Sequence, residues 1–445
     1  MRVLKEDPEA LLSRFAAFES GLNGAKTAWA HELRRAGLGH ARELGIPTTR
    51  NEEWRYTNVA RLAKDAFELA APAPVAPEAL KPFGFSGLGG PRLVFVNGHF
   101  DAQLSSAGEL PKGVVAESLK ARIAAGDARV QAHLGRYARQ AEHPFVALNT
   151  AFLLDGAFVF VPKGVQAEAP IHLLFVTTES AAPAVSHPRN LLVFEDGARA
   201  QVVEHYAGLS GGAYFTNAVT EAAVGAGANV DHTKLQQESL EATHIASAEI
   251  RLARDARYAN HSISLGGKLT RNDVNAKLDG ERVECTVNGF YIANAAQHVD
   301  NHTIVDHAQP HGRSYEVYKG VMDDEAVAVF NGKIFVRPGA QKTDAKQDNK
   351  HLLLSRAAEV QTKPQLEIFA DDVKCTHGAT VGQLDKNALF YLRARGIGRG
   401  EALRLLTLAF AEDVLKEIGH EALRADVAER VHRRMEATTA LRSGA

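Results

Sequence analysis

The sequence has almost nothing that could serve as a covalent staple or a membrane anchor. Only two of its 445 residues are cysteine, which is too few for a disulfide framework. The opening residues Met1 to Pro8 lack the apolar core of a secretory signal peptide. The most apolar stretch, Leu403 to Leu415, is broken by charged residues and is well short of the ~20 apolar residues that a membrane span needs. We therefore expect a protein of the reducing cytoplasm that makes no membrane contact.

The sequence also lacks an excess of charge of either sign. Its 51 Lys and Arg residues and 53 Asp and Glu residues give a formal net charge of −2. This balance provides no electrostatic attraction to nucleic acid, so we expect no nucleic-acid partner. A complete phosphate-binding loop is missing too. In the run from Gly266 to Thr270, Leu269 stands where the motif requires Ser or Thr, and we expect no ATP site in this chain.

One of the two cysteines stands two residues before a histidine in the segment Asp371 to Gly382. If this segment is a strand, Cys375 and His377 point to the same face. A thiolate and an imidazole side by side suit iron, zinc, an iron–sulfur cluster or sulfur carried on the thiol. Free cysteine is more often a small buried apolar residue, but the charged neighbours argue against full burial. Two ligands do not complete a site, so further donors must come from elsewhere in this chain or from a second chain.

A second candidate metal site lies where histidines and aspartates alternate. His298 and His302, with Asp300 between them, would share one strand face and could ligate a metal. They could equally satisfy one another by hydrogen bonding, and the spacing matches no standard zinc signature. The whole set comprises His298, Asp300, His302, Asp306, His307 and His311.

The other cysteine, Cys285, alternates with apolar residues in the run Val283 to Val287. This alternation is typical of a core strand and favours a structural role for the thiol. A relay of sulfur through Cys285 is the alternative interpretation.

The middle of the chain repeats a turn followed by an alternating strand. Successive turns are 30, 29 and 24 residues apart, about the length of one rung of a wide β-solenoid. Such a stack has open ends to which strands of another chain can add. The turns are Asp196–Gly197, Ala226–Gly227, Asp255–Ala256 and Asp279–Gly280.

Helical periodicity flanks this repeat on both sides. Residues 8–65 carry apolar residues at helical spacing, and an Ala-, Pro- and Gly-rich stretch from Ala70 to Gly90 predicts an extended linker. Near the other end, the apolar stripes of Leu403 to Ile418 and Leu423 to Met435 predict two helices that bury each other or clasp a partner. We expect an N-terminal helical region with linker at 1–90, a β core at 91–383 and a C-terminal helical domain at 384–445.

Several longer motifs in the second half of the chain occur in an order that matches a known family. They are Asn331 to Lys333, Arg337 to Ala345, Leu352 to Ser355, Thr362 to Ile368, Asp371 to Gly382 and Phe390 to Ile397. Together with Trp54 to Thr57 they closely resemble the SufB/SufD family of iron–sulfur cluster assembly proteins. The SufD branch is the nearer one, because SufB carries a cysteine in the segment from Asp348 to Ser355, and no cysteine stands there.

The resemblance implies a mainly β protein with a right-handed parallel β-helix core and helical regions at both ends. It implies a non-catalytic scaffold subunit that pairs with SufB through the β-helix and docks the ATPase SufC through Leu403 to Ile418. His377 is then similar to the residue that contributes to a transient iron–sulfur cluster at the SufB–SufD interface, with Cys375 as a companion thiol. SufB would supply the remaining donors, and a homodimer of the isolated chain stays open.

Two alternatives belong to different functional classes. One is a β-helix enzyme, such as a polysaccharide lyase or a metal-dependent isomerase that uses His298 to His311. The other is a sulfur acceptor like SufB. A lyase would normally be secreted, and we expect no export of this chain, so we favour the scaffold.

Overall fold

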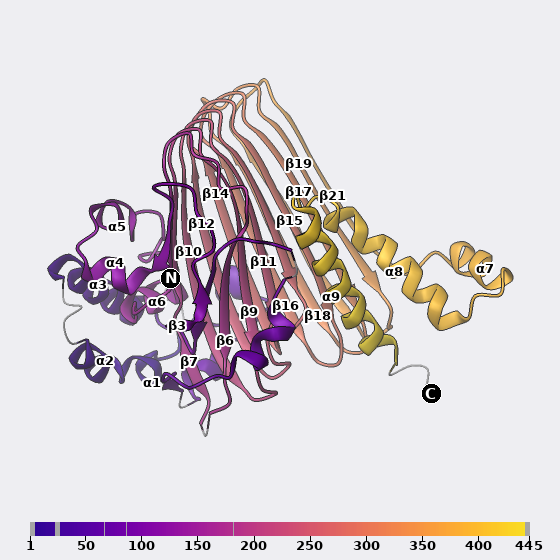
Figure 1. Cartoon of the computed structure of the whole chain (residues 1–445). Coiled ribbons are helices and arrows are strands. Elements are labelled where there is room, and N and C mark those ends of the chain that lie inside the picture. Colours follow the sequence, from indigo (N-terminus) through magenta and orange to yellow (C-terminus); the bar gives the residue numbers. More distant parts are fainter. Residues whose placement is uncertain (1–4, 23–26, 66, 86, 181, 441–445) are drawn as a thin grey trace.

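Two mainly parallel β-sheets form a β-solenoid of about eight turns (Figure 1). The computed structural model describes residues 5–22, 27–65, 67–85, 87–180 and 182–440. Each turn adds one strand to each sheet, so from β8 onward even-numbered strands pair in the first sheet and odd-numbered strands in the second. The predicted mainly β solenoid with helices at both ends is confirmed.

The first sheet ends at β20, and the second ends at β21. The first contains β4 (Val115–Ser118), β5 (Ala157–Val161), β8 (Arg189–Phe194), β10 (Tyr214–Val224), β12 (Thr243–Leu252), β14 (Leu269–Leu278), β16 (His298–His307), β18 (Val327–Val336) and β20 (Glu359–Ile368), with β1 (Glu68–Leu69) and β7 (Ala184–Ser186) at its side. The second contains β3 (His99–Ser106), β2 (Arg92–Val96), β6 (Ile171–Thr177), β9 (Arg199–Gly208), β11 (Asn229–Gln237), β13 (Arg257–Ser264), β15 (Glu284–Ala293), β17 (Arg313–Met322), β19 (Asp344–Leu353) and β21 (Lys374–Gly382).

Tight turns lead into the strands of the second sheet. The first three predicted turns lie within two residues of the starts of β9, β11 and β13. The fourth predicted turn, at Asp279–Gly280, is wrong. The chain turns at Glu281 and Arg282, and Arg282 has a φ of 56°. Gly280 is small for another reason, since a Cβ there would collide with the backbone of Arg254 in the preceding turn. The Asp-Gly pair therefore marks a close approach between turns.

The core between the sheets is built of columns, because residues at the same position of successive rungs stack in register. Phe95 lies parallel to Phe175 with ring centroids 4.7 Å apart, and Phe175 lies parallel to Tyr206 at 4.9 Å. Small residues make room for large ones in the next rung. Gly289 pairs with Tyr318, and Gly320 pairs with Tyr291, so that each ring covers a glycine.

Helices cover the beginning and the flank of the solenoid. The N-terminal helices pack with α6 against the outer face of the first sheet at Phe215 and Ile245. In the described part of the chain, no helix combines the length and apolar character that a bilayer crossing requires. The helices in the first third of the chain are α1 (Glu9–Leu12), α2 (Phe15–Gly21), α3 (Ala28–Leu44), α4 (Leu119–Ala124), α5 (Ala128–His133) and α6 (Pro144–Ala151), with short 3-10 helices η1 (Glu52–Trp54), η2 (Ala60–Ala63) and η3 (Pro77–Phe83).

The predicted linker lies along the solenoid. Within it η3 buries Leu80 against the outer side of the second sheet, and Leu88 is buried beside the C-terminal helices.

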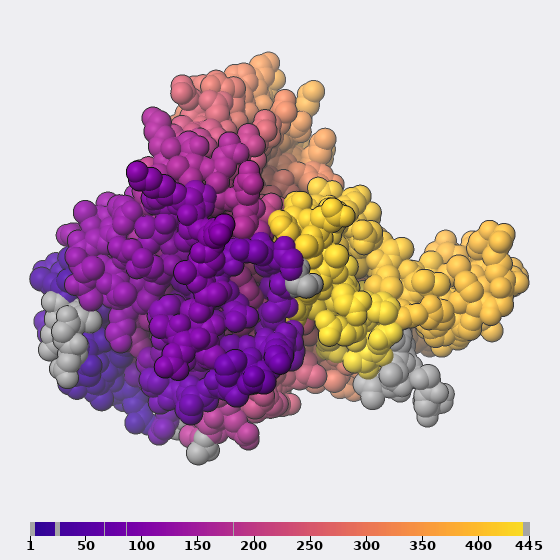
Figure 2. All heavy atoms as spheres, viewed as in Figure 1, coloured from indigo at the N-terminus to yellow at the C-terminus, as the bar shows by residue number. Residues whose placement is uncertain are grey.

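The C-terminal helices α7 (Lys386–Ala394), α8 (Arg399–Leu415) and α9 (Glu421–Ala440) take two different positions. Val414 of α8 and Val427 of α9 bury each other against Phe290 on the outer face of the second sheet. The two predicted apolar stripes therefore bury each other where the second half of α8 packs against α9. By contrast, α7 and the start of α8 stand clear of the body (Figures 1 and 2).

We expect Gly289→Ala to lower the free energy of unfolding by about 1–3 kcal/mol, because the added methyl group overlaps the ring of Tyr318 inside a packed core. Urea denaturation of the full chain measures the change. The matched control is Gly339→Ala in a turn of the solenoid, where a Cβ meets nothing within 4 Å. Equal losses in the two variants would contradict the tight fit between rungs.

Candidate functional site

The solenoid ends in two strands that each have a neighbour on one side only. β20 pairs with β18, and β21 pairs with β19. Within the described residues no further strand continues either sheet. The backbone groups on the outer edges of β20 and β21 are therefore available to strands from another chain.

Cys375 and His377 both lie on β21, two residues apart, on the side that faces the interior of the solenoid. Cys375 is in register with Ala345 and packs beside Ile334 and Val336. His377 is in register with Gln347, and its side chain is exposed. At earlier positions this face is buried between the sheets, but the last rung leaves it uncovered, so both side chains lie at the open end.

Cys375 is partly buried, whereas His377 is exposed. Partial burial, with a further contribution from Asp344, raises the pKa of the Cys375 thiol above its ordinary value. The thiol is therefore protonated at neutral pH, and it would lose its proton only when a cation binds it. Throughout the described ranges, no group of three or more His, Cys, Asp or Glu side chains is placed to hold a metal ion. The pair offers one sulfur and one nitrogen donor.

Exposed apolar side chains surround this open end. Phe369 is 57% exposed and Val381 is 44% exposed. Ile368, which directly precedes Phe369, is exposed as well. On the projecting α7, Phe390 and Tyr391 are exposed as well. Apolar side chains of this size beside unpaired strand edges are typical of protein–protein contact surfaces.

Behind His377 the interior of the solenoid is polar. Gln347 donates a hydrogen bond from Nε2 to Glu316 at 2.8 Å, and the Thr303 hydroxyl donates to the same carboxylate at 2.5 Å. All three side chains are buried. Burial raises the pKa of Glu316 to about 7, although both hydrogen bonds act in the opposite direction. Sequence patterns gave no sign of this group, because its members come from three strands that are distant in sequence.

Cys285 lies in the same interior column as Cys375, with Ser314 and Ala345 between them. It is part of the main hydrophobic core. Burial, and to a lesser degree Glu316, raises the pKa of this thiol to about 12. A thiol that is neutral at every physiological pH is a poor nucleophile, which agrees with the structural role favoured by the sequence.

The histidines of the second candidate site do not converge. His298 and His302 lie on the outer face of the first sheet, whereas His307 faces the interior and contacts the hydroxyl of Ser314 at 2.9 Å. His311 lies in a turn, with a φ of 62°. The four side chains therefore belong to three different environments, and a single metal could not collect them.

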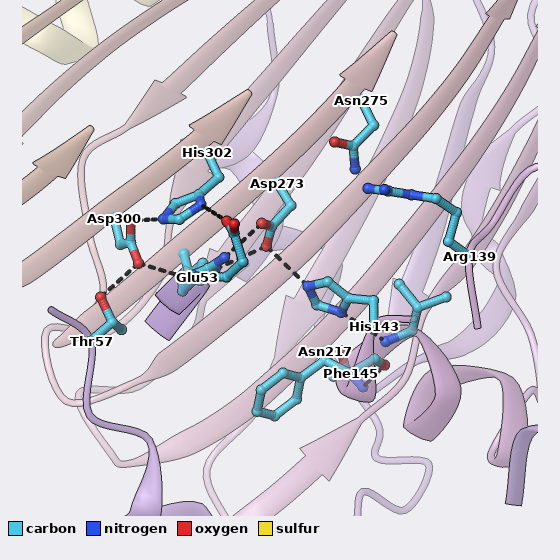
Figure 3. Close-up of polar contacts among 12 residues, drawn as sticks. Glu53, Thr57, Arg139, His143, Phe145, Asn217, Asp273, Asn275, Asp300 and His302 are labelled. Atoms are coloured by element: carbon cyan, nitrogen blue, oxygen red, sulfur yellow. Dashed lines mark hydrogen bonds and ion pairs between the residues drawn. The ribbon is translucent and has the colours of Figure 1, made fainter. Parts of the chain in front are cut away.

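Asp300 and His302 contact the N-terminal segment from Glu53 to Thr57 (Figure 3), and His298 contacts it as well. The Thr57 hydroxyl donates to Asp300 at 2.6 Å and lies 2.9 Å from His298 Nε2. His302 bridges Asp300 at 3.0 Å and Glu53 at 3.3 Å. As metal ligands His298 and His302 stay a prediction, and in this structure each has polar protein partners.

Arg271 is the centre of this contact. Its guanidinium lies 3.8 Å from the ring centroid of Trp54 and pairs with Asp273 and Asp300, each at 2.9 Å. Burial alone would raise the pKa of Asp300, but His302 and Arg271 lower it to about 2. The aromatic and charged patch around Trp54 is thus a packing contact. A groove of about 960 Å³ runs beside it, between the N-terminal region and the sheet.

We expect Arg271→Leu to lower the free energy of unfolding by about 3–5 kcal/mol, because it leaves two buried carboxylates without their cation. Urea denaturation followed by Trp fluorescence measures the loss. Arg251→Leu is the control, since its pair with Asp279 is 38% exposed on both sides, and we expect a change of about 1 kcal/mol or less. Similar effects of the two substitutions would contradict the central role of Arg271.

Comparison with known proteins gives matches along almost the whole chain. The family model for the SUF system FeS cluster assembly SufBD core domain matches residues 175–410, and that for the SufBD protein N-terminal region matches residues 6–173. The iron–sulfur cluster assembly protein SufD of Escherichia coli is 34% identical over 88% of this chain and 90% of its own length. An iron–sulfur cluster assembly SufBD family protein of Synechocystis is 34% identical over 84% of each chain. SufD of Bacillus subtilis is 28% identical over 92% of this chain and 94% of its own.

Proposed function

Because the chain belongs to the SufBD family of iron–sulfur cluster assembly proteins, we propose that it is a non-catalytic scaffold subunit of the SufD type. In this role it pairs with a SufB subunit, and a nascent cluster forms between the two chains before transfer to apo-proteins. The observation that carries the proposal is the incomplete donor pair, Cys375 and His377, on the uncovered last rung. Such a pair is useful only when another chain completes the ligand set.

Pairing through the β-solenoid is supported by the shape and chemistry of its open end. The outer edges of β20 and β21 have backbone donors and acceptors without a neighbouring strand among the described residues. A partner with a parallel solenoid end can pair with these strands and cover Phe369 and Val381 at the same time. The same edges would permit a homodimer when the partner is missing.

The cluster is cargo in this proposal, and the chain contributes one thiolate and one imidazole to hold it. Cys375 would bind iron as a thiolate and release its proton on binding, as a thiol with a raised pKa must. The exposed His377 would bind through a ring nitrogen. Both cysteines are free in the structure, which fits a reducing compartment such as the cytoplasm.

Docking of a SufC-type ATPase is the second part of the proposal. The predicted docking segment, Leu403 to Ile418, is divided in two by the structure. Val414, Leu415 and Ile418 are buried against this chain's own α9 and sheet, so they are not free for a partner. The other half, including the 39% exposed Leu405, lies next to α7 with its exposed Phe390. We therefore place the docking surface on α7 and the first half of α8, and ATP hydrolysis on the partner.

The alternative of a β-helix enzyme has less support, because His298, His302, His307 and His311 are spread over three environments. A relay of sulfur through Cys285 has less support as well, because this thiol is buried with a pKa of about 12. Sustained turnover of any substrate by the isolated chain would favour an enzyme and contradict the scaffold.

We expect His377→Ala to reduce the iron and acid-labile sulfide bound to the co-expressed complex about tenfold or more, while the complex still assembles. Anaerobic purification followed by iron and sulfide analysis measures the effect. Thr376→Ala is the matched control, because Thr376 is exposed on the same strand and points to the face opposite its two neighbours. Normal cluster content in His377→Ala would remove this residue from the site.

We expect Leu405→Glu to abolish co-purification with the SufC-type ATPase, because it places a charge in the centre of the proposed docking surface. Pull-down from a strain that expresses both chains measures binding. Leu240→Glu is the control, since Leu240 is 50% exposed on a distant loop. If both variants retain the ATPase, the exposed half of α8 is not the docking surface.

A further inference from the structure

The residue beneath His377 in the preceding rung is Gln347, and the two strands are paired in register at this position. In-register residues of neighbouring parallel strands lie about 4.8 Å apart, so their side chains stack on the same face. His377 therefore lies between Gln347 of the preceding rung and the open end of the solenoid. Any role of this neighbour at the cluster rests on the proposed function, in which His377 is a ligand.

Gln347 is held in one orientation by the residues around it. Its Nε2 donates to Glu316, whose carboxylate also accepts a hydrogen bond from Thr303. Gly332 lies against the same amide, and a Cβ at Gly332 would collide with Gln347 Nε2. The amide can neither rotate nor withdraw without losing these contacts.

This orientation leaves the amide oxygen without a partner. Gln347 is only 2% exposed, and within the described residues its Oε1 accepts no hydrogen bond. A buried carbonyl oxygen of this kind is normally satisfied, and an unpaired one destabilises the fold. His377 lies one strand spacing away and in register, and its exposed imidazole carries an N–H donor that can turn toward this oxygen.

We propose that Gln347 is the positioning residue for His377: when the exposed imidazole turns toward the interior, the unpaired Oε1 accepts its N–H, and the other ring nitrogen is directed toward the open end. A metal-ligating histidine commonly donates its second nitrogen to an oxygen in this way, which fixes both the tautomer and the ring plane. Glu316 and Thr303 act one step further back by holding the amide. Burial raises the pKa of Glu316, and its two hydrogen-bond donors, Gln347 and Thr303, are both neutral.

The test compares three variants of the full chain. Gln347→Leu removes the acceptor and keeps similar volume. The double variant Glu316→Gln with Gln347→Glu exchanges donor and acceptor between the two positions and keeps an oxygen for His377. Lys346→Leu is the control, because Lys346 is an exposed neighbour on the opposite face of β19. Circular dichroism and urea denaturation confirm that each variant folds.

The first measurement is the tautomer of His377 in the isolated chain at pH 8, from ¹⁵N chemical shifts of labelled histidine assigned with His377→Gln. We expect one dominant tautomer in the wild type, the double variant and Lys346→Leu, and a mixture in Gln347→Leu. A mixture already in the wild type, or no change in a folded Gln347→Leu, would overturn the proposal.

The second measurement is iron and sulfide bound to the co-expressed complex. We expect Gln347→Leu to lower cluster content about tenfold and the double variant to restore most of it. If Gln347→Leu changes the tautomer but cluster content stays normal in both Gln347→Leu and His377→Ala, the proposed function fails, and the cluster role of Gln347 fails with it. If only His377→Ala lowers cluster content, the proposed function stands and the positioning role of Gln347 is overturned.

Discussion

In-register stacking of parallel strands is the constraint on which this structure depends. Every residue of a rung has an equivalent directly above and below it, so each position of the repeat becomes a column through the whole solenoid. The residues of one column must therefore be compatible in size and polarity. Aromatic rings therefore stack on aromatic rings, glycines face the tyrosines of the next rung, and buried polar residues such as Glu316 and Gln347 find their partners in neighbouring rungs.

The same constraint explains why the candidate site lies at the last rung. A column has no neighbour at its end, so residues that would be core anywhere else become accessible there while keeping a fixed backbone position. Cys285 and Cys375 show the contrast within one column: the first is sealed in the core with a pKa of about 12, and the second lies at the uncovered end. The position in the stack decides whether the thiol is inert or available.

Sequence reasoning identified the solenoid and the shared face of Cys375 and His377, because both depend on local patterns: turns at regular intervals and alternation at two residues. It failed where neighbours are separated by a whole rung. Asp279–Gly280 has the composition of a turn but reflects contact with Arg254 in the preceding rung. The histidines from His298 to His311 are close in sequence, yet alternation and an intervening turn distribute them over different faces. Gln347 and Glu316 carry no local signal at all.

The contact between Trp54 and Arg271 also sets an order of events during synthesis. Thr57 bonds to Asp300 across 243 positions of the chain, and Glu52 pairs with Lys363 across 311 positions. A ribosome that has released residue 57 must add more than half of the protein before those partners exist. Until β14 has been added, the indole of Trp54 has no guanidinium to cover it. Closure of this contact then reports that the nascent solenoid has grown as far as β16.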